Sequence, residues 1–144
     1  MTLSTFCVCL QCHRVNRVSI GLADEKMAVC GQCKQDLPLH GAVSDVDSDG
    51  FKPLIEKSGQ AVVIDFWAPW CGPCRAFAPV FSVCATKWAG QIVFAKLNTQ
   101  IHPAPAQALQ IRSIPTLVLF ESGLEKKRIS GALSEGQFEA WLKG

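Results

Sequence analysis

The chain has 144 residues, eight of them cysteine, and its 14 basic and 12 acidic side chains leave a formal charge of +2. This near balance gives no reason to expect nucleic acid or an anionic membrane as a partner, and no stretch approaches the roughly 20 apolar residues that cross a bilayer. The first ten residues lack a basic residue and a long apolar run, so no signal peptide is predicted and a cytoplasmic protein is expected.

Five of the eight cysteines lie before Leu37, in a segment with few large apolar side chains. So short a segment cannot bury enough surface to hold itself together without a cross-link or a metal. Two Cys-x-x-Cys pairs, separated by residues 13–29, have the spacing of a four-cysteine zinc site. We therefore predict a zinc-binding module over residues 1–37, with one zinc ion held by Cys9, Cys12, Cys30 and Cys33.

The fifth cysteine, Cys7, does not fit this spacing and is interpreted as a spare thiol, with replacement of Cys9 as a ligand left as the alternative. His13 and His40 could also bind a metal, but His13 adjoins Cys12 and is expected to point outward, so both are left out. Gly31 is expected to provide the tight turn of the second pair. The alternative to zinc is that the four cysteines are free thiols, or disulfides formed in air.

Residues 38–41 are predicted to link this module to a second domain over residues 42–144, which has the size of an ordinary domain and is expected to fold by itself. Its apolar patterns predict strands over residues 42–46, 61–67, 92–97, 116–120 and 124–130. Helical spacing and capping residues predict helices over residues 48–57, 71–88, 103–109 and from Ser134 onward. Strands and helices in this order indicate an α/β domain with helices on both faces of one sheet.

The run Trp70-Cys71-Gly72-Pro73-Cys74 falls where the buried strand over residues 61–67 turns into the helix over residues 71–88. The first N–H groups of a helix stabilise a negative charge, so a thiol placed there has a lowered pKa and reacts as a thiolate. Cys74 is close enough along the helix to form a small disulfide ring with Cys71, and Pro73 is tolerated in the first turn. The alternatives are half of a metal site and a structural disulfide.

Asp65 interrupts the apolar strand over residues 61–67, which is expected to be covered on both faces. Burial away from water should raise the pKa of this carboxyl, and that suits a group that accepts a proton near neutral pH. The alternative is an aspartate on an exposed face. Cys84, on the buried face of the following helix, is interpreted as a small core residue rather than a redox thiol.

These residues together resemble the thioredoxin family. The resemblance rests on Val-Ile-Asp-Phe-Trp followed by Trp-Cys-Gly-Pro-Cys, extends from about Ala42 to Lys143, and includes Ile114-Pro115-Thr116 and the segment that begins at Gly131. The segment from Cys9 to Val18 is also similar to the N-terminal zinc segment of certain bacterial thioredoxins. The resemblance implies the thioredoxin fold, a mixed sheet with helices on both faces, preceded by a small zinc-ribbon-like module.

The resemblance also implies roles for individual residues. Cys71 would attack a substrate disulfide and Cys74 would resolve the mixed disulfide, while Asp65 would lie beneath Cys74 as its base. Supporting positions in this family match Gly72, Pro73 and Lys96, the last as partner of the aspartate. A flat docking surface for substrates would be formed by Trp70, Ile114, Pro115 and Gly131, with Pro115 in the cis form.

The function that the resemblance implies is reduction of protein disulfides. Electrons would come from a flavoprotein, the NADPH-dependent thioredoxin reductase, and the chain itself would hold a redox-active disulfide but no bound redox cofactor. An oxidase or isomerase is disfavoured by Gly72-Pro73 and by the lack of a histidine between the two cysteines. The alternative outside this class is a redox-sensitive zinc-binding chaperone or docking module. Two departures from the family pattern, Ser113 and Gln100, leave partner choice open.

Overall fold

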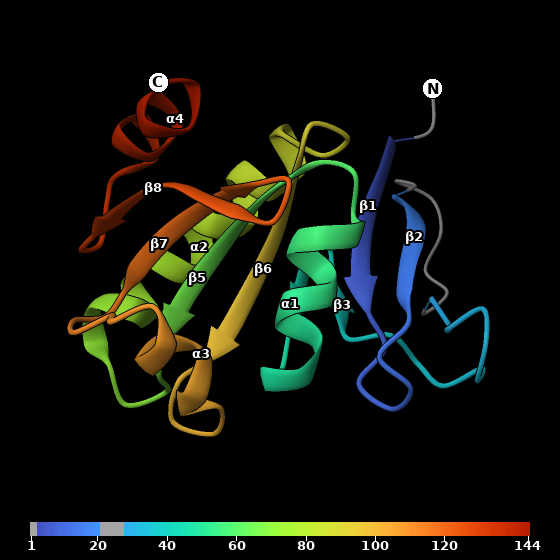
Figure 1. Cartoon of the computed structure of the whole chain (residues 1–144). Helices are drawn as coiled ribbons and strands as arrows, with labels where there is room; N and C mark the ends of the chain where they lie inside the picture. Colours follow the sequence, from blue (N-terminus) through green and yellow to red (C-terminus); the bar gives the residue numbers. More distant parts are fainter. Residues whose placement is uncertain (1–2, 21–27) are drawn as a thin grey trace.

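The computed structural model describes residues 3–20 and 28–144, which form a two-stranded sheet and a six-stranded sheet with four helices (Figure 1). The strands are β1 Leu3–Val8, β2 Val15–Ile20, β3 Leu39–His40, β4 Val43–Asp45, β5 Ala61–Trp67, β6 Ile92–Asn98, β7 Thr116–Glu121 and β8 Leu124–Ser130. The helices are α1 Ser48–Lys57, α2 Gly72–Lys87, α3 Pro103–Ala108 and α4 Glu135–Lys143.

The large sheet has the strand order β3-β4-β6-β5-β7-β8, and the three adjacent strands β4, β6 and β5 run parallel. The strands β7 and β8 continue the sheet in antiparallel fashion. One apolar cluster lies between the sheet and α1 with α3, and a second lies between the opposite face and α2 with α4. The predicted mixed sheet with helices on both faces is therefore confirmed.

The N-termini of α1 and α4 are each capped by a side chain of the preceding residue, and the sequence predicted one of these two caps. Helix α1 is capped by Asp47, whose carboxylate accepts a hydrogen bond from the Gly50 N–H (2.7 Å). Helix α4 is capped by Ser134 in the predicted capping box with Gln137. Among the described residues, no helix is both long enough and apolar enough to cross a bilayer.

The N-terminal segment differs most from the expectation. It contains a regular hairpin, β1–β2, in which Leu3 pairs with Ile20 and Val8 pairs with Val15. Part of the expected linker, Leu39–His40, is the strand β3, paired with β4 at the edge of the large sheet. The reason is that backbone at a sheet edge gains hydrogen bonds by pairing, and Gly41 (φ 64°) permits the tight reversal between the two strands.

The hairpin shares its core with the second domain. Val8 is 1 % exposed and belongs to the apolar cluster beneath α1, with Phe6 and Val15 packed against the same cluster. Figure 1 shows β1 lying directly beside α1. Removal of the hairpin would expose apolar surface on residues 42–144 that is now buried. Independent folding of this domain stays a prediction.

Gly50 marks the closest approach of α1 and β1, and it provides a test of this packing. A Cβ atom at Gly50 would lie 2.9 Å from Cγ1 of Val8, so one of the two elements would have to move. Alanine normally favours a helix interior over glycine by about 1 kcal/mol, but we expect Gly50→Ala to lower the free energy of unfolding. In a double-mutant cycle measured by urea unfolding, Val8→Ala alone should lower the free energy of unfolding by about 2 kcal/mol. In the double variant, Val8→Ala should relieve part of the destabilisation caused by Gly50→Ala. Additive effects of the two substitutions would contradict this packing.

Candidate active site and cysteine cluster

The structure joins Cys71 and Cys74 in a disulfide at the start of α2, with their Cα atoms 5.2 Å apart. Cys71 is the N-cap residue, and the backbone N–H of Cys74 points at its Sγ atom over 3.2 Å. Cys71 is buried apart from 5 % of its surface, whereas the neighbouring Trp70 is 69 % exposed. In the reduced protein this geometry directs the partial positive charge of the helix N-terminus at the Cys71 sulfur, which favours the thiolate.

Asp65 lies in the middle of β5 with no exposed surface, as the sequence predicted. Burial raises the pKa of this carboxyl to about 7, against the opposing effect of the nearby Lys96 charge. Neither carboxyl oxygen has a hydrogen-bond partner among the described residues. The expected partner Lys96 pairs with Asp65 in the sheet register, but its Nζ atom lies over the Trp67 ring, 4.2 Å from the ring centre.

The Ile114–Pro115 peptide bond is cis, in line with the resemblance. The Ile114 carbonyl oxygen lies 3.8 Å from Cys71 Sγ, and Ile114 packs against the cluster of Ala68, Cys71 and Cys74. Gly131 donates its N–H to the Pro115 carbonyl (2.9 Å) in a left-handed conformation (φ 105°) that favours glycine. The structure therefore brings Ile114, Pro115 and Gly131 together beside the disulfide, and a half-buried Ile114 backbone faces the redox sulfur.

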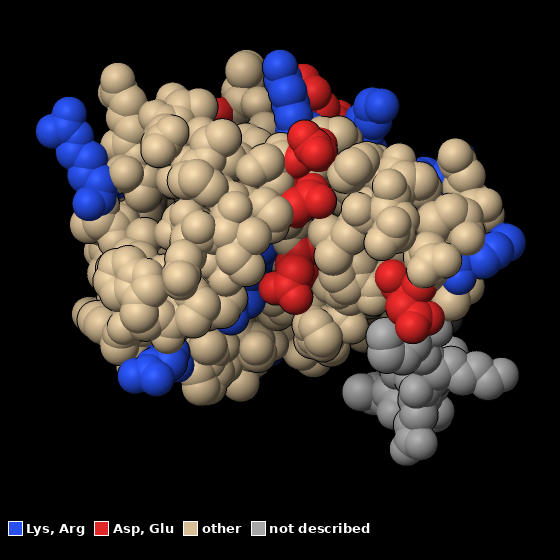
Figure 2. Space-filling view, turned by 90° about the horizontal axis from the view of Figure 1, so that it is seen from below, with Lys and Arg blue, Asp and Glu red and all other residues tan. Residues whose placement is uncertain are grey.

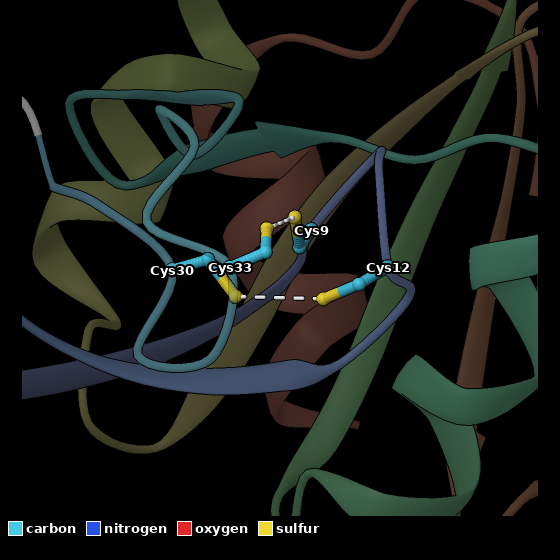
Figure 3. Close-up of side chains that lie close together, drawn as sticks. All are labelled: Cys9, Cys12, Cys30 and Cys33. Atoms are coloured by element: carbon cyan, nitrogen blue, oxygen red, sulfur yellow. Dashed lines mark hydrogen bonds between the residues drawn. The ribbon is translucent and has the colours of Figure 1, made fainter.

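The four predicted metal ligands also come together. Their Sγ atoms all lie within 4.8 Å of one another, with Cys9 and Cys33 3.5 Å apart and Cys12 and Cys30 3.6 Å apart. Figure 3 shows the sulfurs pointing at a common centre from two loops. A tetrahedral zinc site with Zn–S bonds of about 2.3 Å has sulfurs about 3.8 Å apart, so this arrangement fits a zinc ion. Cys7 lies outside the cluster, and burial raises the pKa of its thiol to about 12.

The two loops of the cluster have the same backbone geometry. His13 N–H donates to Cys9 O and Lys34 N–H donates to Cys30 O, and both His13 (φ 63°) and Lys34 (φ 67°) are left-handed. Gly31 lies within the turn of the second pair, as expected, but the left-handed residue is the one that follows the second cysteine of each pair. His13 directs its imidazole toward Asp47 (3.5 Å) rather than toward the sulfurs.

Asn16 is the residue of this cluster whose role the sequence did not indicate. Its side chain is buried, donates to Cys30 Sγ (3.5 Å) and accepts from the Gly31 N–H (3.0 Å). A further donor, the Gln32 N–H, lies 3.4 Å from the same sulfur. Donors of this kind stabilise a metal-bound thiolate and orient it. A polar residue in β2 that faces the second pair could not be found without knowing how the hairpin folds onto that pair.

Comparison with known proteins agrees with this geometry. The thioredoxin family model matches residues 42–144. Thioredoxin C-3 of Corynebacterium nephridii is 43 % identical over 139 residues, which cover 94 % of this chain and 91 % of that protein. The chloroplastic M-type thioredoxin of Spinacia oleracea is 44 % identical over 91 residues (63 % of this chain, 50 % of that protein). The thioredoxin of Porphyra purpurea is 40 % identical over 101 residues (70 % and 94 %).

The raised pKa of Asp65 predicts how stability depends on pH. The folded protein keeps a proton on this carboxyl up to about pH 7, whereas an exposed aspartate releases it near 3.8. The free energy of unfolding should therefore fall as the pH rises from about 4 to about 7, and then level off. Asp65→Asn should remove this dependence and be more stable than the parent at pH 8, by an amount on the order of 4 kcal/mol, with little difference at pH 4.

The measurement is urea unfolding of the oxidised proteins at several pH values. Glu121→Gln, which changes a carboxyl whose side chain is 52 % exposed, serves as the control and should leave the pH profile unchanged. Parallel profiles for the parent and Asp65→Asn would show that Asp65 titrates normally and would contradict the assignment.

Proposed function

The chain belongs to the thioredoxin family, and on that premise we propose that it reduces protein disulfides through Cys71 as the attacking thiol and Cys74 as the resolving thiol. The observation that carries this assignment is the position of Cys71 at the N-cap of α2, with the Cys74 N–H directed at its sulfur (3.2 Å). Cys74 is the third residue of α2 and is 2 % exposed, against 5 % for Cys71.

The reaction proceeds in two exchange steps. The Cys71 thiolate attacks one sulfur of the substrate disulfide, forming a mixed disulfide and releasing the other substrate sulfur as a thiolate. The Cys74 thiolate then attacks Cys71 Sγ, closing the Cys71–Cys74 disulfide and releasing the second substrate thiolate. Two electrons pass from the protein to the substrate, and the oxidised protein is the form that the structure shows.

Asp65 suits the second step. Cys74 must lose its proton in a buried place, and a carboxyl with a pKa of about 7 can accept a proton at neutral pH. Because its oxygens have no other partner in the described structure, the carboxyl is free to take this proton. Trp70, Ile114, Pro115 and Gly131 form the apolar surface against which the substrate docks, with the Ile114 backbone able to pair with an extended chain.

The oxidised protein needs a source of two electrons for the next turnover. We propose that an NADPH-dependent thioredoxin reductase supplies them through the same two cysteines, and that the protein works in the cytoplasm. The support for the electron donor is the family membership together with a disulfide that adjoins the exposed Trp70. No bound redox cofactor is needed for this chemistry, since both electrons pass through sulfur.

We propose that the N-terminal cluster holds one zinc ion through Cys9, Cys12, Cys30 and Cys33, and that the chain is a thioredoxin of the zinc-containing type. The support is the mutual distance of the sulfurs and the donors from Asn16 and Gln32 to Cys30. Bound zinc would supply the cross-links that a short hairpin cannot obtain from its own apolar core. It would act on structure rather than on the exchange reaction.

Substitution of the two redox cysteines tests their roles. Cys71→Ser should abolish disulfide reduction, because no attacking thiolate remains. Cys74→Ser should react once and accumulate as a mixed disulfide with a protein substrate, because no thiol resolves it. Non-reducing electrophoresis followed by mass spectrometry identifies the trapped complex. A complex trapped by Cys71→Ser and not by Cys74→Ser would reverse the assignment.

Metal analysis tests the zinc proposal. Protein purified under reducing conditions should contain one zinc per chain, and Cys9→Ser should lower this content to well below one. Cys7→Ser is the matched control, since Cys7 is equally buried in the same hairpin but lies outside the sulfur cluster. Full zinc content in Cys9→Ser with loss in Cys7→Ser would show that Cys7 is the ligand.

A further inference from the structure

A cleft of about 260 Å³ lies between the first cysteine loop and the carboxyl ends of β4, β6 and β5. The hairpin contributes Leu10 to its wall, and the large sheet contributes Asp45, Trp67 and Lys96. The loop after β6 contributes Ile101 and His102. None of the steps proposed above uses this cleft, and the N-terminal segment supplies part of its wall through Leu10.

The cleft is acidic, although the chain as a whole carries a charge of +2. Asp45 and Asp47 line it, and Asp49 follows in the first turn of α1. In Figure 2 acidic side chains form a line along the groove between the two lobes of the molecule. Histidine side chains lie against all three carboxylates: His40 Nε2 is 3.5 Å from Asp45, and His13 Nε2 is 3.5 Å from Asp47 and 3.9 Å from Asp49. With these imidazoles neutral, Lys96, whose ammonium lies over the Trp67 ring (4.2 Å), is the one Lys or Arg among the described residues that line the cleft. The groove therefore complements a positive charge.

The same groove has apolar walls that remain open to solvent. Leu10 is 43 % exposed and Ile101 is 67 % exposed. Both belong to the small set of large apolar side chains that the described residues leave uncovered. A segment that combines a basic head group with a large apolar side chain would satisfy both features, because the apolar side chain covers the walls while the charge meets the carboxylates.

The groove is continuous with the redox site. Trp67 lines the cleft and packs against the cluster that contains Cys71 and Cys74. Asp45, Lys96 and Asp65 are register partners across β4, β6 and β5, so Asp45 lies two strand spacings, or about 10 Å, from the strand that leads into the redox site. An extended chain covers this distance in about three residues.

From this we propose that the groove binds a segment of the substrate protein with a Lys or Arg beside a large apolar residue, located three or four residues from the disulfide that is reduced. The proposal rests on the proposed disulfide-reductase function and specifies its substrate class. The N-terminal module thus contributes Leu10 to substrate recognition in addition to its metal cluster. No step of the exchange reaction itself changes.

Two sets of disulfide peptides test the proposal. One set carries Leu-Arg three or four residues before or after the disulfide cysteine, and the other carries Leu-Glu at the same places. The full-length, zinc-loaded, prereduced protein is mixed with each peptide, and loss of protein thiols is followed over a single turnover. We expect the best Leu-Arg peptide to react about fivefold faster than its Leu-Glu counterpart at low ionic strength, and this preference to shrink at about 0.5 M salt.

Substitutions then test which side chains cause the preference for Leu-Arg peptides. Asp45→Asn with Asp49→Asn should reduce it to less than about twofold, while the capping residue Asp47 is left intact. The matched control, Glu56→Gln with Glu121→Gln, changes two exposed carboxyls near the opposite end of β5 and should leave the preference intact. Leu10→Ser should slow the Leu-Arg peptide, whereas Leu124→Ser, which changes a leucine 74 % exposed on β8, should not.

Hydroxyethyl disulfide is too small to reach the groove. Its reduction therefore tests the reductase function separately from the groove proposal. Failure of the parent protein with this substrate would overturn the reductase function and the groove proposal together. Normal reduction with no preference for Leu-Arg, or a preference that survives Asp45→Asn with Asp49→Asn, would overturn the groove proposal alone. So would a dimer in sedimentation that this double variant abolishes, because the groove would then bind a second copy of the chain.

Discussion

The junction between β5 and α2 is the constraint on which the rest of the molecule depends. A buried strand ends at Trp67, and helix α2 begins directly after Cys71, so the sulfur is fixed where unpaired N–H groups of the helix converge. The sheet holds Asp65 on the same strand, two residues before it ends. The nucleophile, the resolving thiol and the proton acceptor therefore keep their relative positions through one stretch of backbone, and the cis Pro115 loop closes the site from the neighbouring strand β7.

The N-terminal segment follows a different physical logic. It has too little apolar surface to form a domain, and it obtains order from two sources: four convergent sulfurs at one end and the core beneath α1 at the other. Asn16 connects the two cysteine loops, and His13 faces the Asp47 cap of α1 across the boundary. The module is thus joined to the fold near the redox site, where its first loop forms one wall of the acidic groove.

Much of the second domain could be predicted from the sequence because its signals are local. The apolar run around Asp65, the Ser134 capping box and the Trp70–Cys74 motif each identify an element without reference to distant residues. The spacing of the two cysteine pairs likewise predicted which sulfurs meet. The strand, the capping box and the redox motif depend on residues within one or two helical turns, which is the range over which periodicity and capping operate. The cysteine pairs lie further apart, and it is their metal-site spacing that carries the signal.

What the sequence did not disclose depends on contacts between segments. The strand β3 and the packing of Val8 against Gly50 arise only after the hairpin meets the sheet. The direction of Lys96 toward Trp67 is likewise set by a contact between two neighbouring strands. The acidic groove combines residues from the first loop, β4 and the segment after β6, so no single stretch of sequence contains its signal.

In the proposed mechanism, the N-terminus of α2 makes Cys71 the reactive thiolate of the reduced protein. The rate at which Cys71 is alkylated, measured as a function of pH, is the test of this assignment. We expect iodoacetamide to label Cys71 before Cys74. The pH midpoint of the Cys71 labelling rate should lie below the pKa of a free cysteine, which is about 8.5. Peptide mapping of the first label identifies the residue. Preferential labelling of Cys74 would contradict the assignment of Cys71 as the reactive thiolate. So would a pH midpoint of Cys71 labelling at or above the pKa of a free cysteine.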